Sequence, residues 1–217
     1  MIRTNRSAKG ILSLCLPAIA AAAALLSCSV ARAQILITVS AENVTAAAGS
    51  TGDALDITLT NGGPGSVTIG AFAFEVTVPS TDITLTGVTT GTTAVYVFSG
   101  ESLFGPGIGI PVSGQDMMAS DVSSGAGTTV GAGATVGLGH LVFDVAGSAS
   151  GVYPVSLVAF PATSLSDPNS GNIDITILNN GSITVTGGRS NVPEPGSLAL
   201  LGGLVAPGGL LLRRRRR

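Results

Sequence analysis

The chain has 217 residues, of which 45% are hydrophobic and only 10% are charged. Its formal net charge of −2 hides an uneven distribution, because nine of the ten basic residues lie in 1–33 or in the terminal run 213–217, and Arg189 is the tenth. Eleven acidic residues lie from Glu42 to Asp174, so the body of the chain is strongly acidic and repels phosphate backbones. This distribution excludes DNA and RNA as partners.

The N-terminal segment has the features of a secretory signal peptide. Three basic residues in the first nine precede an uncharged stretch rich in Ala and Leu, as in the charged and apolar regions of such a peptide. Ala31 and Ala33 place small residues at the two positions that a signal peptidase reads. We therefore expect residues 1–33 to be removed and the mature chain to begin at Gln34.

A second cleavage site also fits the sequence. Residues 25–28 (Leu-Leu-Ser-Cys) loosely resemble a lipobox, in which Cys28 would be lipidated and become the first mature residue. If cleavage follows Ala33 instead, Cys15 and Cys28 are both lost. The mature chain would then have no thiol for a disulfide, a nucleophile or a metal site.

Residues 34–186 predict one all-β domain, followed by a linker at 187–192. The body is rich in Val, Ile, Thr, Gly and Ser and has no long 3.6-residue period, which favours strands and tight turns over helices. A single domain of this size buries about 70% of its unfolded surface. Strands are expected at 35–39, 55–60, 68–78, 83–86, 95–98, 115–119, 135–145, 152–160, 173–178 and 182–186.

Local patterns refine this assignment. Within 68–78, Phe72 and Phe74 share one face of a strand and Glu75 lies on the other, so the aromatic rings are expected in the core and the carboxylate near water. Residues 179–181 (Asn-Asn-Gly) tolerate positive φ and predict a hairpin between the last two strands. The Gly- and Ser-rich stretches 100–114 and 120–133 are expected to be long surface loops.

The order of these segments resembles that of cohesin domains. The resemblance rests on the opening strand before Gly52-Asp53, on 71–76 (AFAFEV), 139–145 (GHLVFDV) and 151–155 (GVYPV), and on the final 180–185 (NGSITV). It covers most of 35–186 and implies a cohesin-like jelly-roll sandwich of about nine strands. Cohesins capture a partner, so the resemblance also implies an alternative function as a module that binds a protein or a carbohydrate through one sheet face.

Residues suited to catalysis are scarce, so we expect neither an enzyme nor a cofactor. His140 is the single histidine, and alternation places it opposite Leu141 and Phe143, toward the surface. Clusters of His and Cys that could bind a metal are excluded. A hydrolase with two carboxylates is a second alternative. Its candidate pairs, Asp53 with Asp56 and Asp116 with Asp121, are better explained as turn or solvated residues.

The body of the chain offers two further candidate binding sites. The oxygen-rich residues Asp167, Asn169, Asn172 and Asp174 form a weak calcium candidate, although such residues are also typical of a turn. Sugar binding usually needs an exposed aromatic platform, and the chain has no Trp. Phe72, Phe74, Phe143 and Phe160 are expected at apolar strand positions, with Tyr96, Phe98 and Phe104 near loops.

The C-terminal segment has three parts in a fixed order: Val192-Pro193-Glu194-Pro195, an apolar stretch at 196–212 and the arginines 213–217. The prolines keep the motif extended and accessible to a protease. The apolar stretch is shorter than the roughly 20 residues of a stable span, and the arginines would stay on the cytoplasmic side. A transient membrane-held tail is expected.

This arrangement resembles the PEP-CTERM sorting signal, here at 193–217. The resemblance implies recognition of Pro193, Glu194 and Pro195 by a membrane-embedded exosortase, which supplies the catalytic cysteine. It also implies a secreted protein at the cell surface or in the extracellular matrix, with a structural role in exopolysaccharide or biofilm and with exopolysaccharide or another surface protein as partner. The alternative is that 196–217 is an ordinary membrane anchor.

Overall fold

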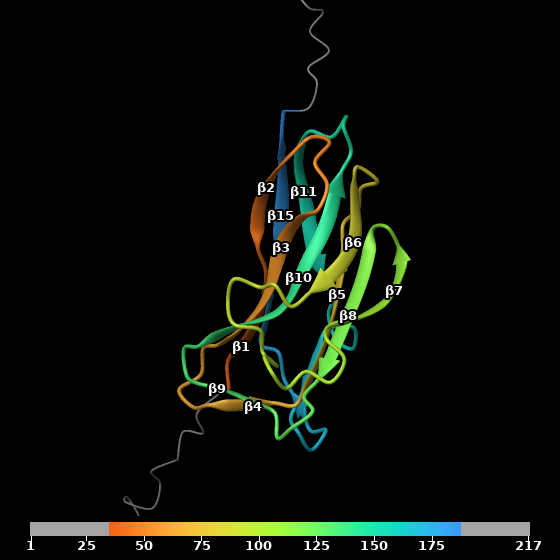
Figure 1. Cartoon of the computed structure of the whole chain (residues 1–217). Helices are drawn as coiled ribbons and strands as arrows, with labels where there is room; N and C mark the ends of the chain where they lie inside the picture. Colours follow the sequence, from red (N-terminus) through yellow and green to blue (C-terminus); the bar gives the residue numbers. More distant parts are fainter. Residues whose placement is uncertain (1–34, 188–217) are drawn as a thin grey trace, which may run out of the picture. The chain divides into compact units, whose positions relative to one another are not determined.

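The structure, a computed structural model, describes residues 35–187, which form two large β-sheets and a small one (Figure 1). The five-stranded sheet has the order β14 (Ile177–Asn179), β1 (Ile37–Ala41), β3 (Asp53–Asn61), β10 (Thr135–Val145) and β6 (Ile83–Thr89). The eight-stranded sheet runs β13 (Asn172–Ile173), β12 (Ser164–Ser166), β5 (Ala71–Thr77), β11 (Gly151–Leu157), β15 (Gly181–Thr186) and β2 (Asn43–Ala47), with β8 (Asp116–Val122) on β5 and β7 (Gly107–Ser113) on β8. β4 (Val67–Ile69) and β9 (Thr128–Val130) form the small sheet. The predicted all-β sandwich is confirmed, in fifteen strand segments where about nine were expected.

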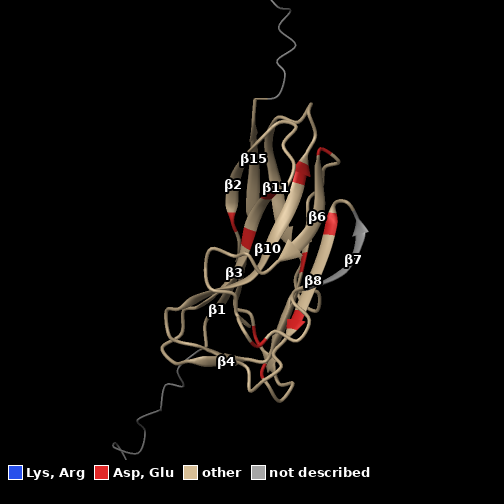
Figure 2. Cartoon of the chain, viewed as in Figure 1, with Lys and Arg blue, Asp and Glu red and all other residues tan. Residues whose placement is uncertain are grey.

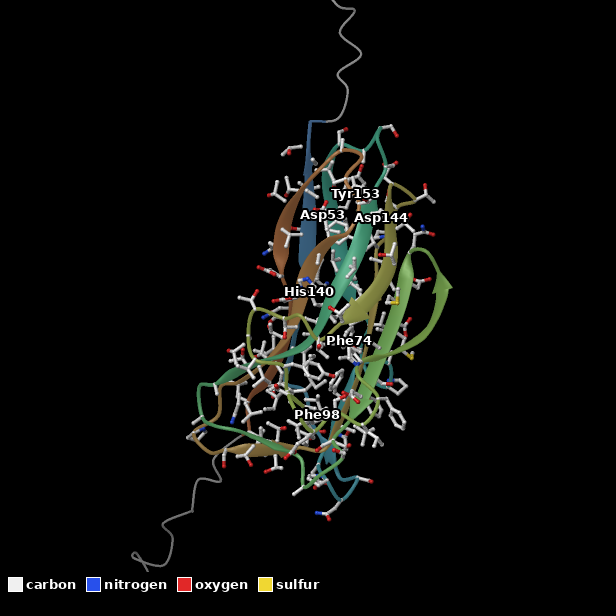
Figure 3. The ribbon with its side chains drawn as sticks, viewed as in Figure 1. Asp53, Phe74, Phe98, His140, Asp144 and Tyr153 are labelled. Atoms are coloured by element: carbon white, nitrogen blue, oxygen red, sulfur yellow. The ribbon has the colours of Figure 1, made fainter. Side chains whose placement is uncertain are left out.

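The hydrophobic core combines inward side chains from both large sheets. Ile57 on β3 and Leu141 on β10 are fully buried, as is Phe74 on β5, which Figure 3 shows within the domain. The predicted alternation of β5 is confirmed, because Phe72 and Phe74 are buried and Glu75 is partly exposed. Gly139 lies at a bulge in β10 against the Phe74 ring, so the absence of a side chain there lets the two sheets approach.

Two segments cross between the sheets side by side. β1 pairs in parallel with β14 in one sheet, and β2 pairs in parallel with β15 in the other. The chain therefore changes sheet at Glu42 and again at Asn180. The Oδ1 atom of Asn180 accepts a hydrogen bond of 2.9 Å from the Leu157 backbone N–H, which fastens the second crossing to β11.

The predicted hairpin between 173–178 and 182–186 is wrong. β14 and β15 belong to different sheets and pair with β1, β11 and β2 rather than with each other. The Asn-Asn-Gly sequence makes a sheet-to-sheet crossing here, because Gly181 must pack directly against the backbone of Glu42. Local turn chemistry is compatible with both outcomes, and the parallel partner strands select the crossing.

Two other strand predictions and the two loop predictions also need correction. The segment 68–78 is divided at Gly70, whose backbone packs against that of Asp167. The part before Gly70 is β4, which pairs with β9 in the small sheet, and the part after it is β5. The segment 95–98 forms a turn with one isolated bridge, from Tyr96 to Gly137. The two stretches expected as loops, 100–114 and 120–133, contain β7, the end of β8 and β9.

The aromatic side chains also differ from expectation. Phe160 follows the end of β11 and is 71% exposed, although it was expected at an apolar position within a strand. Tyr96 and Phe98, expected near loops, do belong to one, but they are buried. A loop can contribute to a core when its large side chains point inward, and alternation cannot reveal this outside a strand.

Candidate protein-binding surface

The segment 95–105 joins the two large sheets and is fixed to the core by aromatic side chains. Phe98 is fully buried, and its ring stacks on Phe72 with centroids 5.7 Å apart and planes at 23°. Tyr96 meets Phe98 edge to face with centroids 6.4 Å apart. Offset-stacked and edge-to-face arrangements are those that aromatic pairs prefer. Phe98 therefore anchors the segment within the domain (Figure 3).

A buried carboxylate holds the same segment on β8. Oδ2 of Asp121 accepts hydrogen bonds from the Tyr96 hydroxyl at 2.6 Å and from the Ser102 hydroxyl at 2.5 Å. Asp121 is only 2% exposed, so these charge-assisted bonds compensate for the loss of water around the carboxylate. Burial, together with the Asp121 carboxylate, raises the pKa of Tyr96. The phenol thus remains a hydrogen-bond donor.

Backbone contacts complete the attachment. The Leu103 N–H donates to the Val122 carbonyl at 3.0 Å, and Ser102 forms an isolated antiparallel bridge with Ser123. The Ser124 N–H donates to the Glu101 carbonyl at 2.6 Å. Residues 101–103 are therefore held against the end of β8 by both main-chain and side-chain bonds.

This fixed segment presents large apolar side chains to solvent. Leu103 is 52% exposed, Phe104 is 76% exposed and the adjacent Val122 is 42% exposed. We call these three residues the apolar patch. Apolar residues that a rigid scaffold holds in water are typical of protein interaction sites. The sequence signal was the Leu-Phe pair inside an otherwise Gly- and Ser-rich stretch, which composition alone had marked as a loop.

The electrostatic environment is negative throughout the domain. Residues 35–187 include eleven acidic side chains and neither Lys nor Arg, and Figure 2 shows acidic residues on several strands and loops. Glu101 is exposed immediately beside the apolar patch. Any partner that docks here would gain from basic residues around its own apolar contact.

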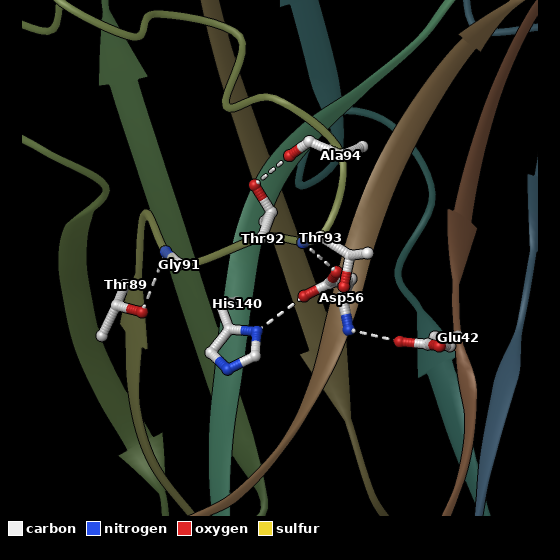
Figure 4. A network of polar contacts seen from close by, with 8 residues as sticks. All are labelled: Glu42, Asp56, Thr89, Gly91, Thr92, Thr93, Ala94 and His140. Atoms are coloured by element: carbon white, nitrogen blue, oxygen red, sulfur yellow. Dashed lines mark hydrogen bonds and ion pairs between the residues drawn. The ribbon is translucent and has the colours of Figure 1, made fainter.

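A second polar network lies on the five-stranded sheet (Figure 4). Nδ1 of His140 on β10 donates to Oδ1 of Asp56 on β3 at 2.6 Å, and the Thr93 N–H donates to Oδ2 of Asp56 at 2.7 Å. Burial opposes ionisation of Asp56, but the bonds from His140 and Thr93 outweigh it and hold the pKa of Asp56 below its usual value. His140 is partly exposed and lies opposite the buried Leu141 and Phe143, as alternation predicted.

The weak calcium candidate forms a turn after β12. Oδ1 of Asp167 accepts from the backbone N–H groups of Asn169 at 2.8 Å and Gly171 at 2.7 Å. Nδ2 of Asn172 donates to Oδ1 of Asp174 at 2.9 Å. Within 35–187 no group of three or more His, Cys, Asp or Glu side chains is placed to hold a metal ion. Calcium binding stays a prediction, and the turn interpretation accounts for the bonds of Asp167.

The remaining predicted site residues lie outside the described part of the chain. These are the cleavage residues Ala31, Ala33 and Gln34, the lipidation candidate Cys28 and the sorting motif Val192, Pro193, Glu194 and Pro195. The same holds for the apolar stretch 196–212. Within residues 35–187 no helix is long and apolar enough to cross a membrane.

Comparison with known proteins places the fold. No family model and no curated protein matches this sequence. The solved structures that match include cohesin CaCohA2 from Clostridium acetobutylicum, with a TM-score of 0.54, 18% identity, and coverage of 71% of this chain and 94% of that one. The seventh ScaB type I cohesin from Pseudobacteroides cellulosolvens matches with a TM-score of 0.52 and 18% identity, and the match covers 73% of this chain and 97% of that one. A chain of the Coh-OlpC-Doc435 complex from Clostridium thermocellum, a type I cohesin–dockerin complex, matches with a TM-score of 0.52 and 15% identity. That match covers 70% of this chain and 95% of the other.

The fold is cohesin-like. This conclusion agrees with the expectation from the order of strands, and identities below 20% limit it to the fold. The match spans nearly the whole length of each of these cohesins.

Proposed function

We propose that the cohesin-like domain is a non-enzymatic binding module that captures a protein partner through the apolar patch, and that the rest of the chain delivers the module to the cell surface. The observation that carries the proposal is the exposure of Leu103 and Phe104 on a segment that Asp121 and Phe98 attach to the rest of the domain. The likeness to a cohesin solved in complex with a dockerin supports a protein as the partner.

The chemistry of the patch defines the kind of partner. Phe104 is the most exposed of its three residues, and large apolar side chains dominate binding energy when a partner excludes water from them. Glu101 beside the patch favours a partner with Lys or Arg at the rim of its own apolar contact. We therefore expect the association rate to fall as the ionic strength rises.

The non-enzymatic part of the proposal rests on how the polar groups are used. His140 directs Nδ1 to Asp56, which is the orientation that a catalytic base would need. However, among residues 35–187 no Ser, Thr or Tyr hydroxyl forms a hydrogen bond with His140. Asp56 and Asp121 lie in different sheets, and each is bound to structural donors. His140, Asp56 and Asp121 therefore hold parts of the fold together.

The delivery part of the proposal rests on the sequence outside the domain. The signal-like residues 1–33 support export, and the resemblance of 193–217 to a PEP-CTERM signal supports sorting by an exosortase. The mature module would then be released or retained at the surface, where exopolysaccharide or another surface protein surrounds it. Localisation and partner capture are separate claims with separate tests.

Partner capture is tested by photo-crosslinking in cells that produce the protein. A benzophenone amino acid replaces Phe104 in the full chain, and a matched variant carries the same group at Phe160, which is similarly exposed but lies on a different segment. We expect illumination to yield a discrete protein adduct from position 104 and none of that size from position 160. No discrete adduct, or the same adduct from both positions, would show that the apolar patch is not the binding surface.

Sorting is tested by replacing Pro193, Glu194 and Pro195 with alanine in a host that has an exosortase. The intact mass of the exported native protein should correspond to a chain that begins at Gln34 and has lost the residues after the motif. The variant should keep its tail in the membrane. If both forms retain Arg217 and remain embedded, the tail is an ordinary anchor. That outcome leaves the proposal for the apolar patch unaffected.

A further inference from the structure

A pocket lies between the segment that follows β11 and the segment that contains β13 and β14. Its volume is about 420 Å³, which is within the usual range of roughly 300–1,000 Å³ for small-ligand sites. Phe160 lines it together with Ile173, Ile175 and Leu178. The pocket therefore combines an aromatic ring with an aliphatic lining.

The aromatic ring is presented to solvent. Phe160 is 71% exposed, whereas Ile173 is only 9% exposed and belongs to the core cluster. An exposed phenyl ring next to a partly covered aliphatic surface provides a flat apolar area that a ligand can cover. Sugar binding usually needs an exposed aromatic side chain of this kind, whereas the sequence pattern predicted an apolar strand position for Phe160 instead.

Polar groups line the same pocket. Asn172 and Asp174 are both exposed and joined by a hydrogen bond of 2.9 Å, which leaves Oδ1 of Asn172 and Oδ2 of Asp174 as open acceptors at neighbouring positions. The buried Thr163 also lines the pocket, and its Oγ1 accepts a long bond of 3.4 Å from the Glu75 N–H. A few polar groups beside an apolar surface give a ligand its orientation.

We propose that this pocket binds a neutral sugar unit of a glycan, with the Phe160 ring against the apolar C–H face of the sugar and the Asn172–Asp174 pair hydrogen-bonded to adjacent hydroxyl groups. A sugar presents apolar C–H groups on one face and hydroxyl donors around its edge, which matches both features of the pocket. The eleven acidic residues of the domain and its lack of Lys and Arg disfavour uronic acids, sulfated sugars and nucleotides.

The glycan site is independent of the proposed function. The pocket uses residues of the segments 159–164 and 172–178, and none of them belongs to the apolar patch. A molecule at the cell surface could use both sites at once, holding a protein partner at one and the surrounding polysaccharide at the other. Failure of either proposal leaves the other standing.

The test is affinity electrophoresis of the full chain, kept in solution by a detergent without a sugar headgroup. Gels contain dextran, galactomannan or arabinoxylan as neutral polysaccharides, or alginate as an anionic one. We expect retardation by at least one neutral polysaccharide and none by alginate. The dissociation constant should rise at least tenfold in Phe160→Ala and severalfold in Asp174→Asn, and it should be unchanged in the control Phe104→Ala, whose ring is also exposed.

Three outcomes would overturn the inference. These are no retardation by any of the three neutral polysaccharides, equal retardation by alginate, and unchanged affinity of Phe160→Ala. Both Phe160 and Asp174 are exposed, so their variants should keep the native melting temperature. A melting curve on each preparation separates loss of binding from loss of folding.

Discussion

Gly181 packs against the main chain of Glu42, so closely that a Cβ atom at position 181 would overlap the Glu42 carbonyl oxygen. The two residues mark the points where β1 continues into β2 and β14 into β15, and each crossing moves the chain from one sheet to the other. The paired crossings join the sheets at this point. Glycine is required at 181 by close approach of backbones.

Replacing Gly181 with alanine should therefore destabilise the domain. The added methyl group meets main-chain atoms that two parallel strand pairs hold in place, so we expect a loss of about 1–3 kcal/mol in the free energy of unfolding. Urea denaturation measures this loss. The matched variant is Gly131→Ala, because nothing lies within 4 Å of a Cβ at that position. Equal stabilities of the two variants would contradict the packing argument.

Phe98 should contribute strongly to stability although it lies in a turn. Its ring is fully buried and stacks on Phe72, so Phe98→Ala should cost about 3–5 kcal/mol through lost burial and the remaining cavity. Phe104→Ala is the control, since its ring is 76% exposed and its removal should change stability by less than about 0.5 kcal/mol. Chemical denaturation distinguishes them, and similar effects at the two positions would show that the segment is not anchored as described.

Asp121 should control the order of the apolar patch. In Asp121→Asn the bonds from Tyr96 and Ser102 lose their charge assistance, which weakens the local structure by about 1–3 kcal/mol. We expect the Leu103 amide, which bonds to Val122, to exchange its hydrogen about tenfold faster or more, while amides of β3 change less. Hydrogen exchange with mass spectrometry reports this. If the Leu103 amide exchanges its hydrogen as slowly in Asp121→Asn as in the native protein, Asp121 does not hold the apolar patch in place.

Asp56 should make the domain sensitive to acid. Its folded-state pKa lies below the usual 3.8 because His140 and Thr93 stabilise the carboxylate. The stabilisation that the Asp56 carboxylate contributes to the folded state is therefore fully present above its unfolded-state pKa. It is lost as the pH falls through its folded-state pKa, so the stability of the domain should decline from about pH 5 downward. Melting temperatures measured from pH 7 to pH 3 should fall less steeply in Asp56→Asn, which cannot ionise.

The Asp56→Asn variant should also be less stable than the native protein at pH 7. The matched control is Asp174→Asn, which removes an exposed carboxylate and leaves the bonds of Asp56 intact. If the melting temperature of Asp56→Asn falls with pH as steeply as that of the native protein, another carboxylate governs acid unfolding.

The sequence predicted best where a strand alternates regularly against one core. The expected strand 135–145 coincides with β10, and alternation correctly placed Phe74 inward and His140 toward the surface. Prediction failed where pairing partners decide the structure. β7 and β9 lie within Gly- and Ser-rich stretches, whose overall composition indicated loops and hid these short strands. Each is paired with a neighbouring strand, β7 with β8 and β9 with β4.

The candidate sites were less accessible to sequence reasoning. Asp56 and His140 are 84 residues apart in the chain, and the register of β3 and β10 brings them together. Tyr96 and Asp121 are 25 residues apart, and their bond depends on how the turn at 95–98 packs against β8. Phe160 was misplaced because the apolar residues 158–160, which follow the end of β11 at Leu157, look like a continuation of the strand. The patch and the pocket are both made of residues whose exposure only the fold determines.

The sequence by itself determined the fold class, the acidic character of the segment between two contrasting termini, and the inward faces of the regular strands. Those properties follow from composition and from period-two alternation, which are local. Tertiary structure decided which sheet each strand joins, which carboxylates are buried, and which aromatic side chains reach solvent. These depend on contacts between segments far apart in the chain, and Gly181 shows the difference: its sequence context suited a hairpin, and its packing against Glu42 made a crossing.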